Sequence, residues 1–128
     1  MTELPDNVGG PVGGILKVTD HVIADLIGYA AMESYGVVGM AAPSLQDGIA
    51  KLLPARTLHR GVTIKHGEDG LSADLYVIIE YGVNISAASN NLADSVRFVL
   101  EVYAGLKVKE VTVHVQGIHN SPRMGDPV

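Results

Sequence analysis

The sequence predicts a single α+β domain in which a small mixed sheet of about four strands carries two main helices on one face. Three observations predict this fold class. Residues 72–81 alternate like a strand and lead through a turn into a helical pattern at 85–104. A second helical pattern begins at residue 20, and the chain of 128 residues, 47% hydrophobic, has the size of one domain. The expected order is β-α-(α)-β-β-α-β.

Both ends of the chain are expected to lie outside this domain. Residues 1–13 contain two prolines and three glycines without periodicity, which is typical of a flexible N-terminal arm. Residues 119–128 contain two further prolines and no pattern, which indicates a disordered tail. The domain is therefore expected to span residues 14–118.

The first elements are expected to be a short strand at Gly14–Val18 and a helix capped by Thr19–Asp20. The apolar residues of this helix cover about 200° of its circumference, more than one contact with a sheet requires. The helix should therefore touch another helix as well. Ala24 and Gly28 are small and four residues apart, so they would allow a close approach there, and Gly36 ends the helical segment.

The middle of the chain predicts a short helix, a strand and a turn. Ser44 and Asp47 have the spacing of a capping box, and Pro54 should stop the short helix that follows. Val62–His66 alternates as a strand, and residues 67–70 read as a turn into the central strand.

Residues 72–81 are predicted to be the central strand because Tyr76 and Ile78 make the middle of the second face apolar too. The long helix should begin at a cap formed by Asn84 or Ser86 and end at Gly105, followed by a last strand at 109–116. The strand residues expected to face the core are Ala73, Leu75, Val77, Ile79 and Tyr81, and the helix residues are Ile85, Leu92, Val96, Val99, Leu100 and Tyr103.

Two apolar surfaces suggest an interaction protein. Phe98 and Val102 lie away from the core stripe of the long helix, so they either pack under residues 41–60 or form an exposed anchor for a partner. Tyr76 and Ile78, on the second sheet face, are covered either by the chain's own short helix or by another subunit.

The sequence gives no sign of an enzyme, a cofactor or a metal site. Cysteine is absent, and the five histidines, including His114 with His119 and His59 with His66, have no familiar ligand spacing. Asp74 and Glu80 share a strand face but lie roughly 20 Å apart, too far to cooperate. Nucleotide loops and the nucleophile elbow G-x-S-x-G are missing as well.

Two features of the sequence suggest nucleic-acid binding as an alternative function. The segment Gly36–Gly39 matches the G-x-x-G loop of KH RNA-binding domains, although neither variable position is basic. No acidic residue occurs between positions 48 and 67, so the basic residues of this segment form a candidate patch for an anionic partner. A net charge of −5 argues against nucleic acid, and a solvated loop is the plainer interpretation. The patch consists of Lys51, Arg56, Arg60 and Lys65.

Five segments of the chain carry a resemblance to a known family: Gly14–Thr19, Gly36–Gly39, Gly61–Val62, Asp74–Ile85 and Gly105–Gly117. Through them the chain resembles, over roughly residues 14–118, the alkaline shock and general stress protein family of bacterial envelope stress response proteins. It departs from the family pattern at Leu92, where many relatives have glutamine, and at Tyr103–Ala104, where a threonine often precedes the glycine.

This resemblance implies a small cytoplasmic protein without known catalytic activity that acts in cell-envelope homeostasis. It implies self-association and, in some relatives, attachment to the membrane through a small integral-membrane protein. The sequence itself contains no apolar run of about 18 residues and no signal peptide. The leading hypothesis is therefore a self-associating scaffold or adaptor, with a KH-like module and a regulatory adaptor of a metabolic enzyme as alternatives. The family's recurring glycines, here Gly36, Gly39, Gly82 and Gly105, are interpreted as fold determinants.

Overall fold

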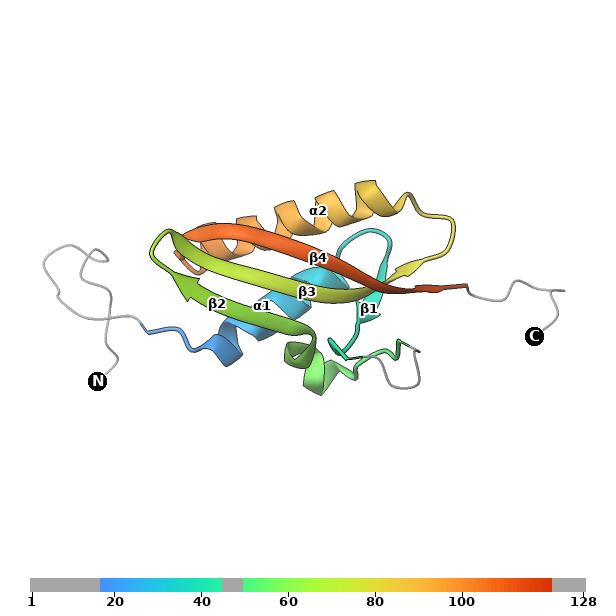
Figure 1. The fold of residues 1–128 in the computed structure, drawn as a ribbon, viewed down its shortest axis with the longest axis horizontal. Coiled ribbons are helices and arrows are strands. Elements are labelled where there is room, and N and C mark those ends of the chain that lie inside the picture. Colours follow the sequence, from blue (N-terminus) through green and yellow to red (C-terminus); the bar gives the residue numbers. More distant parts are fainter. Residues whose placement is uncertain (1–16, 45–49, 121–128) are drawn as a thin grey trace, which may run out of the picture.

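The computed structural model describes residues 17–44 and 50–120, and it confirms the α+β fold class (Figure 1). The expected arm at 1–13 and residues 121–128 of the expected tail lie outside the described residues. The elements are α1 (Asp20–Met32), β1 (Val37–Met40), the 3₁₀ helix η1 (Ala55–Gly61), β2 (Val62–Gly67), β3 (Gly70–Glu80), α2 (Ile85–Phe98), the π-helical turn η2 (Val99–Tyr103) and β4 (Val108–His119). The tail was expected to begin at residue 119, but His119 is the last residue of β4.

The central strand is β3, as the sequence predicts. Its residues 70–75 pair antiparallel with β2 and its residues 77–79 pair antiparallel with β1, so these two strands follow each other along one edge of β3. The other edge of β3 pairs in parallel with β4, which α2 connects to it (Figure 1). The sheet is therefore mixed, with the crossover that parallel strands require.

Both long helices lie on one face of the sheet. The β3 residues Ala73, Leu75, Val77 and Ile79 are almost completely buried there, and α1 and α2 also contact each other. The opposite face carries half-buried Asp74 and Tyr76 and is not covered by a helix among the described residues (Figure 1). Tyr81 was expected to continue the buried row, but it follows the end of β3 and is exposed.

One strand was placed wrongly from the sequence. Lys17 and Val18 belong to no strand, and the rest of the expected strand Gly14–Val18 lies outside the described residues. The fourth strand is instead β1, directly after the helix end. Gly36, with φ of 81°, reverses the chain, and its carbonyl accepts a hydrogen bond from the Glu80 amide at 2.9 Å, which brings the following valines alongside β3.

The prediction of a short helix between Ser44 and Pro54 was also wrong for residues 50–54, the part of it that the structure describes. Residues 45–49 lie outside the described residues, and residues 50–54 are extended, with Leu52 forming an isolated bridge to Ala41. The helix η1 begins after Pro54 rather than ending there. A proline is well tolerated immediately before or at the start of a helix because its missing N–H would have no helical partner.

The predicted helix ends are confirmed. Thr19 Oγ1 accepts a hydrogen bond from the Val22 amide at 3.3 Å, and Asn84 Oδ1 accepts one from the Ala87 amide at 2.8 Å. Gly105 has φ of 68° and closes the second helical segment.

The apolar faces of both helices were predicted only in part. On α1, Ala24 and Gly28 are buried, and a Cβ added at Gly28 would lie 2.9 Å from Leu58 Cβ in η1. The expected second helical contact of α1 is therefore confirmed. On α2 and η2, however, Ile85 and Tyr103 were expected in the core and are exposed. The wider π turn shifts Tyr103 out of the 3.6-residue phase that the prediction assumed.

Candidate functional site

Three side chains form an exposed apolar ridge at the end of the second helical segment. Phe98 is 53% exposed, Val102 58% and Tyr103 75%. The Phe98 and Tyr103 rings meet edge to face with centroids 5.6 Å apart, so the ridge is one continuous surface. Of the two alternatives for Phe98 and Val102, the structure shows the exposed one. We call Phe98, Val102 and Tyr103 the helix ridge.

The helix ridge borders a hollow between the C-terminal part of α1 and the second half of α2. Phe98 and Val99 line this hollow from one side and the exposed Tyr35 from the other. The wall of the hollow also contains the carboxylates Glu33 and Asp94, so the apolar helix ridge has polar groups beside it. Polar groups at the border of an apolar surface are typical of protein interfaces.

The open sheet face offers less apolar surface than the sequence suggests. The Tyr76 ring stacks on the His114 ring with centroids 4.5 Å apart, and His114 Nε2 lies 3.0 Å from Asp74 Oδ1. Ile78 is only 6% exposed, and it lines a hollow together with Ala50 and Leu52. Ile78 therefore has little surface left for a partner, and residues 50–54 form no helix beside it.

The four residues of the basic patch are all exposed but come from different elements. Lys51 precedes the bridge at Leu52, Arg56 and Arg60 belong to η1, and Lys65 lies on the open face of β2. The glycine motif Gly36–Gly39 does not form the free loop that a KH domain uses. Its last three residues are part of β1, and Gly39 is buried beside Leu52.

Histidines and carboxylates meet repeatedly on the surface. His66 Nε2 lies 2.7 Å from Asp20 Oδ1, and His119 Nδ1 lies 3.6 Å from Glu80 Oε2. Together with His114 and Asp74, these are contacts between one imidazole and one carboxylate. Contacts of this kind at exposed positions contribute little to stability.

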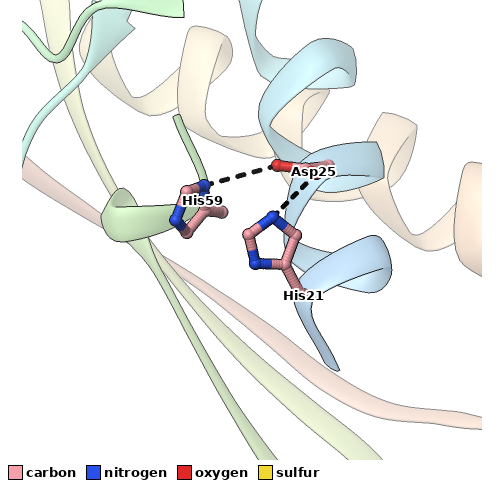
Figure 2. A group of neighbouring side chains, drawn as sticks. All are labelled: His21, Asp25 and His59. Carbon is pink, nitrogen blue, oxygen red and sulfur yellow. Dashed lines mark ion pairs between the residues drawn. The ribbon is translucent and has the colours of Figure 1, made fainter. Parts of the chain in front are cut away.

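A larger group joins α1 to η1. His21 Nε2 lies 3.3 Å from Asp25 Oδ2, and His59 Nδ1 lies 3.5 Å from Asp25 Oδ1 (Figure 2). Each of the three residues has a potential metal-ligand atom, and these atoms all lie within 4.8 Å of one another. The two imidazole rings are tilted against each other with centroids 4.2 Å apart. We call His21, Asp25 and His59 the His-Asp-His cluster.

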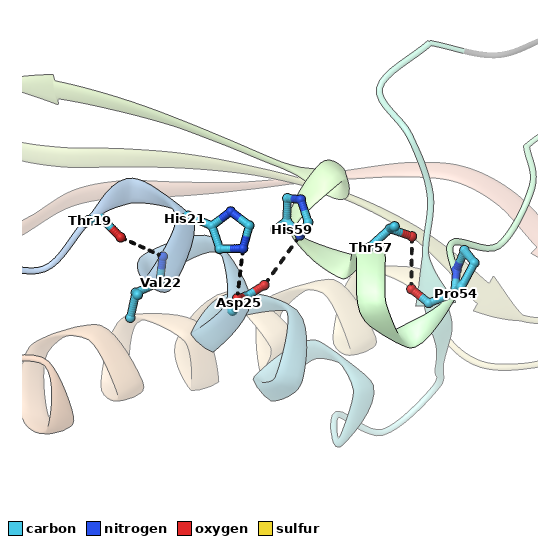
Figure 3. Close-up of polar contacts among 7 residues, drawn as sticks. All are labelled: Thr19, His21, Val22, Asp25, Pro54, Thr57 and His59. Atoms are coloured by element: carbon cyan, nitrogen blue, oxygen red, sulfur yellow. Dashed lines mark hydrogen bonds and ion pairs between the residues drawn. The ribbon is translucent and has the colours of Figure 1, made fainter.

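The local structure explains how this cluster forms. Thr19 starts α1, so His21 and Asp25 stand one turn apart on the same side of the helix (Figure 3). On the other side of the contact, Thr57 Oγ1 donates a hydrogen bond to the Pro54 carbonyl at 3.1 Å at the start of η1, which carries His59. The sequence does not reveal the cluster, although it contains one sign of it. The four-residue spacing of His21 and Asp25 indicates that they lie on the same side of a helix, whereas the contact of His59 with that helix cannot be predicted from spacing.

The structure gives no candidate for a span of the membrane. Among residues 17–44 and 50–120, no helix combines the length and the apolar character that crossing a bilayer would require.

Comparison with known proteins gives a family and several relatives. The profile of the ASP23 family, described as having a cell envelope-related function, matches residues 11–120. The Streptococcus pyogenes serotype M6 protein Spy1614 is 41% identical over 106 residues, which cover 82% of this chain and 88% of the relative. The Bacillus subtilis protein YloU is 33% identical over 106 residues, with the same coverage of 82% and 88%.

Solved structures resemble the chain only distantly. A variant of the MamM CTD aligns with 78% of this chain and 94% of its own, at 10% sequence identity and a TM-score of 0.44. We draw no functional conclusion from a likeness at this level. The family match, in contrast, includes every helix and strand described above.

Proposed function

Because this chain belongs to the ASP23 family of alkaline shock proteins, whose function is cell envelope-related, we propose that it is a non-enzymatic scaffold that self-associates in the envelope stress response. A scaffold needs a surface that binds a further copy of itself. The helix ridge is exposed and apolar, as a surface of this kind must be, and this observation supports the proposal.

The exposure of the helix ridge supports self-association because large apolar side chains gain free energy when they leave water. Burying a phenylalanine or valine side chain completely contributes roughly 1.5–3 kcal/mol. The ridge lies beside the hollow lined by Tyr35, so a second copy would find an apolar surface with a polar border. A two-fold arrangement, in which the ridge of one copy meets the ridge of the other, is the simplest closed form.

The proposal includes a location. A protein with an envelope-related function that acts as a scaffold would work at the cytoplasmic side of the membrane, held there by a small membrane protein. The ridge of an assembled scaffold would be buried between copies, so such a partner would bind elsewhere, and the exposed basic patch is available to it. Removing the charges of this patch should then release the scaffold from the membrane while the oligomer stays assembled.

Light scattering after size-exclusion chromatography tests the proposal. The untagged protein should elute as an oligomer at both ~150 mM and ~500 mM salt because apolar association, unlike charge pairing, is not screened. Phe98→Glu and Val102→Glu should each give a monomer. Tyr81→Glu is the matched control, since Tyr81 is equally an exposed aromatic residue but lies before the N-terminus of α2, at the other end of the helix.

Two results would contradict the proposal. A monomeric wild-type protein would remove self-association altogether. An oligomer that persists in Phe98→Glu and Val102→Glu would show that the copies meet at another surface. Circular dichroism of each variant shows that the fold is retained, so that a monomer can be attributed to the lost contact.

A further inference from the structure

From the geometry of the His-Asp-His cluster, we propose that this chain binds one divalent transition-metal ion of the zinc class between α1 and η1. His21 and His59 would each supply an imidazole nitrogen, and Asp25 would supply a carboxylate oxygen. This inference uses residues that the proposed self-association does not use. It also changes the expectation from the sequence, which predicts no metal site.

The spacing of the ligand atoms fits a tetrahedral ion. Zinc lies about 2.0–2.1 Å from nitrogen and oxygen ligands, so the corners of its coordination tetrahedron are about 3.3–3.4 Å apart. His21 Nε2 lies 3.3 Å from Oδ2 of the Asp25 carboxylate and His59 Nδ1 lies 3.5 Å from Oδ1, so each imidazole is close to a different oxygen. The ligand atoms lie within 4.8 Å of one another, and a small rotation of the carboxylate would bring one oxygen to both imidazoles. His21 is largely exposed, so its ring can turn to bring its nitrogen closer to that of His59 without disturbing the core.

A polar atom in the cluster lacks the partner that a metal would provide. His59 Nδ1 is shielded from solvent and makes no hydrogen bond within residues 17–44 and 50–120, although the Asp25 carboxylate is close. A shielded polar atom without a partner is destabilising. A metal ion bonded to His59 Nδ1 and Asp25 would satisfy both groups at once.

The types of ligand select the class of metal. Two imidazoles and one carboxylate suit zinc and its neighbours, cobalt and nickel, whereas calcium and magnesium prefer sites made of oxygen atoms alone. Three protein ligands leave the fourth position of a tetrahedron to water. His21 is largely exposed and Asp25 is partly exposed, so the ion can enter from solvent.

The packing of η1 on α1 holds the ligands in place before any ion binds. Gly28 and Leu58 are in close contact, and Leu58 immediately precedes His59 in η1. His21 and Asp25 are both fixed to one rigid helix, since they belong to the first two turns of α1. Such preorganisation lowers the entropy that metal binding must overcome.

Calorimetric titration of the untagged protein with zinc tests the proposal. We expect saturable uptake of one ion per chain and an affinity at least about tenfold lower in His21→Ala and in His59→Ala. His66→Ala is the matched control, because it removes an imidazole that contacts a carboxylate near the start of the same helix but has no third ligand. Its affinity should equal that of the wild-type protein.

Two further measurements distinguish a specific metal site from nonspecific binding by separate surface histidines. Cobalt bound at a tetrahedral site should give intense visible absorption that is lost in His59→Ala. Zinc should raise the thermal midpoint of the wild-type protein and of His66→Ala but not that of His59→Ala. Should His59→Ala fail to fold, Asp25→Asn keeps the side-chain volume and takes its place in every comparison.

Either of two outcomes would overturn the metal site. The first is that zinc at about 100 μM gives no saturable uptake. The dissociation constant would then be too high for a resident ion, and the cluster would consist of ion pairs only. Equal weakening by His66→Ala and His59→Ala would show nonspecific binding to surface histidines. The oligomeric state is measured separately, so a failure of the metal site leaves the self-association proposal intact.

Discussion

The two long helices lie side by side on the same sheet, yet their outer sides differ. Part of the outer side of α1 is covered by η1, which packs Leu58 against Gly28 and adds His59 beside Asp25. The second half of α2 and η2 have no comparable cover among the described residues, and Phe98 and Val102 are exposed there. The side of α1 that faces η1 is thus used for internal packing, whereas the corresponding apolar residues of the other helical segment are left at the surface.

This difference identifies where to look for a partner. On α1 the buried small residues at the contact with η1 are explained by the chain's own fold, although Val22, Tyr29 and Met32 of the same helix are exposed. On α2 and η2 the exposed side chains form the helix ridge, and an exposed apolar surface of this kind is a common sign of an interface. The comparison predicts that substitutions should affect stability on α1 and assembly on α2.

The largest effect should come from the sheet-facing residues, where the two helices are alike. Ile27 of α1 and Leu92 of α2 are both completely buried. We expect Ile27→Ala and Leu92→Ala each to lower the free energy of unfolding by about 2–5 kcal/mol, through lost apolar burial and the cavity left behind. Denaturant titration measures this loss. A much smaller loss in one variant would show that its helix packs on the sheet less tightly than the other.

The next largest effect should come from the contact between α1 and η1. In Gly28→Ala the new methyl group would lie 2.9 Å from Leu58 Cβ, and because a Cβ is fixed by its backbone, η1 itself must move. Alanine favours a helix by up to about 1 kcal/mol over glycine, but overpacking costs typically about 1–3 kcal/mol. We therefore expect a net loss of about 1 kcal/mol and weaker zinc uptake.

A stabilising effect of Gly28→Ala would contradict this comparison, since it would mean that η1 is not firmly seated on α1. Ser86→Ala is the matched control, because it adds helix propensity in the first turn of α2 at an exposed position. It should change the free energy of unfolding by less than about 0.5 kcal/mol.

The sequence predicts the elements that depend on local periodicity and on capping residues. The central strand, both main helices and the caps at Thr19 and Asn84 all follow from such signals. It fails where tertiary pairing decides. The four residues of β1 are too few for a periodic pattern, and they form a strand because Gly36 turns them alongside β3.

The candidate sites were predictable to different degrees. A helical wheel places Phe98 and Val102 away from the core stripe, and they are exposed, although their role in an interface stays a prediction. Tyr103 was misplaced because the wheel does not anticipate a π turn. The His-Asp-His cluster needed the structure. Its members His21 and His59 are separated by 38 positions in the sequence, and only the packing of η1 on α1 brings them together.

A smaller effect is expected where α2 supports the edge of the sheet. Arg97 donates hydrogen bonds from Nη1 to the Val108 carbonyl at 3.0 Å and from Nη2 to the Lys109 carbonyl at 3.2 Å, where β4 begins. Arg97→Lys keeps the charge but loses the two-pronged geometry. We expect a loss of about 1 kcal/mol in both Arg97→Lys and Arg97→Ala, measured by denaturant titration. If Arg97→Lys keeps its stability and Arg97→Ala does not, the charge of residue 97, including its contact with Glu101, matters more than the pair of hydrogen bonds to β4.

The smallest effect on folding, and the sharpest test of the difference between the helices, should come from the helix ridge. Phe98→Ser removes a side chain that is 53% exposed, so the unfolding free energy of the isolated chain should change by less than about 0.5 kcal/mol. In an oligomer, however, the same side chain is buried by a second copy, and stability becomes dependent on protein concentration.

The thermal midpoint of the wild-type protein should therefore rise with concentration, while that of Phe98→Ser should not, and the two should converge on dilution. Equal midpoints at every concentration would mean that the ridge is ordinary exposed surface. A loss that persists at high dilution would mean that Phe98 stabilises the single chain, as Leu58 does for α1, and the contrast between the two helices would disappear.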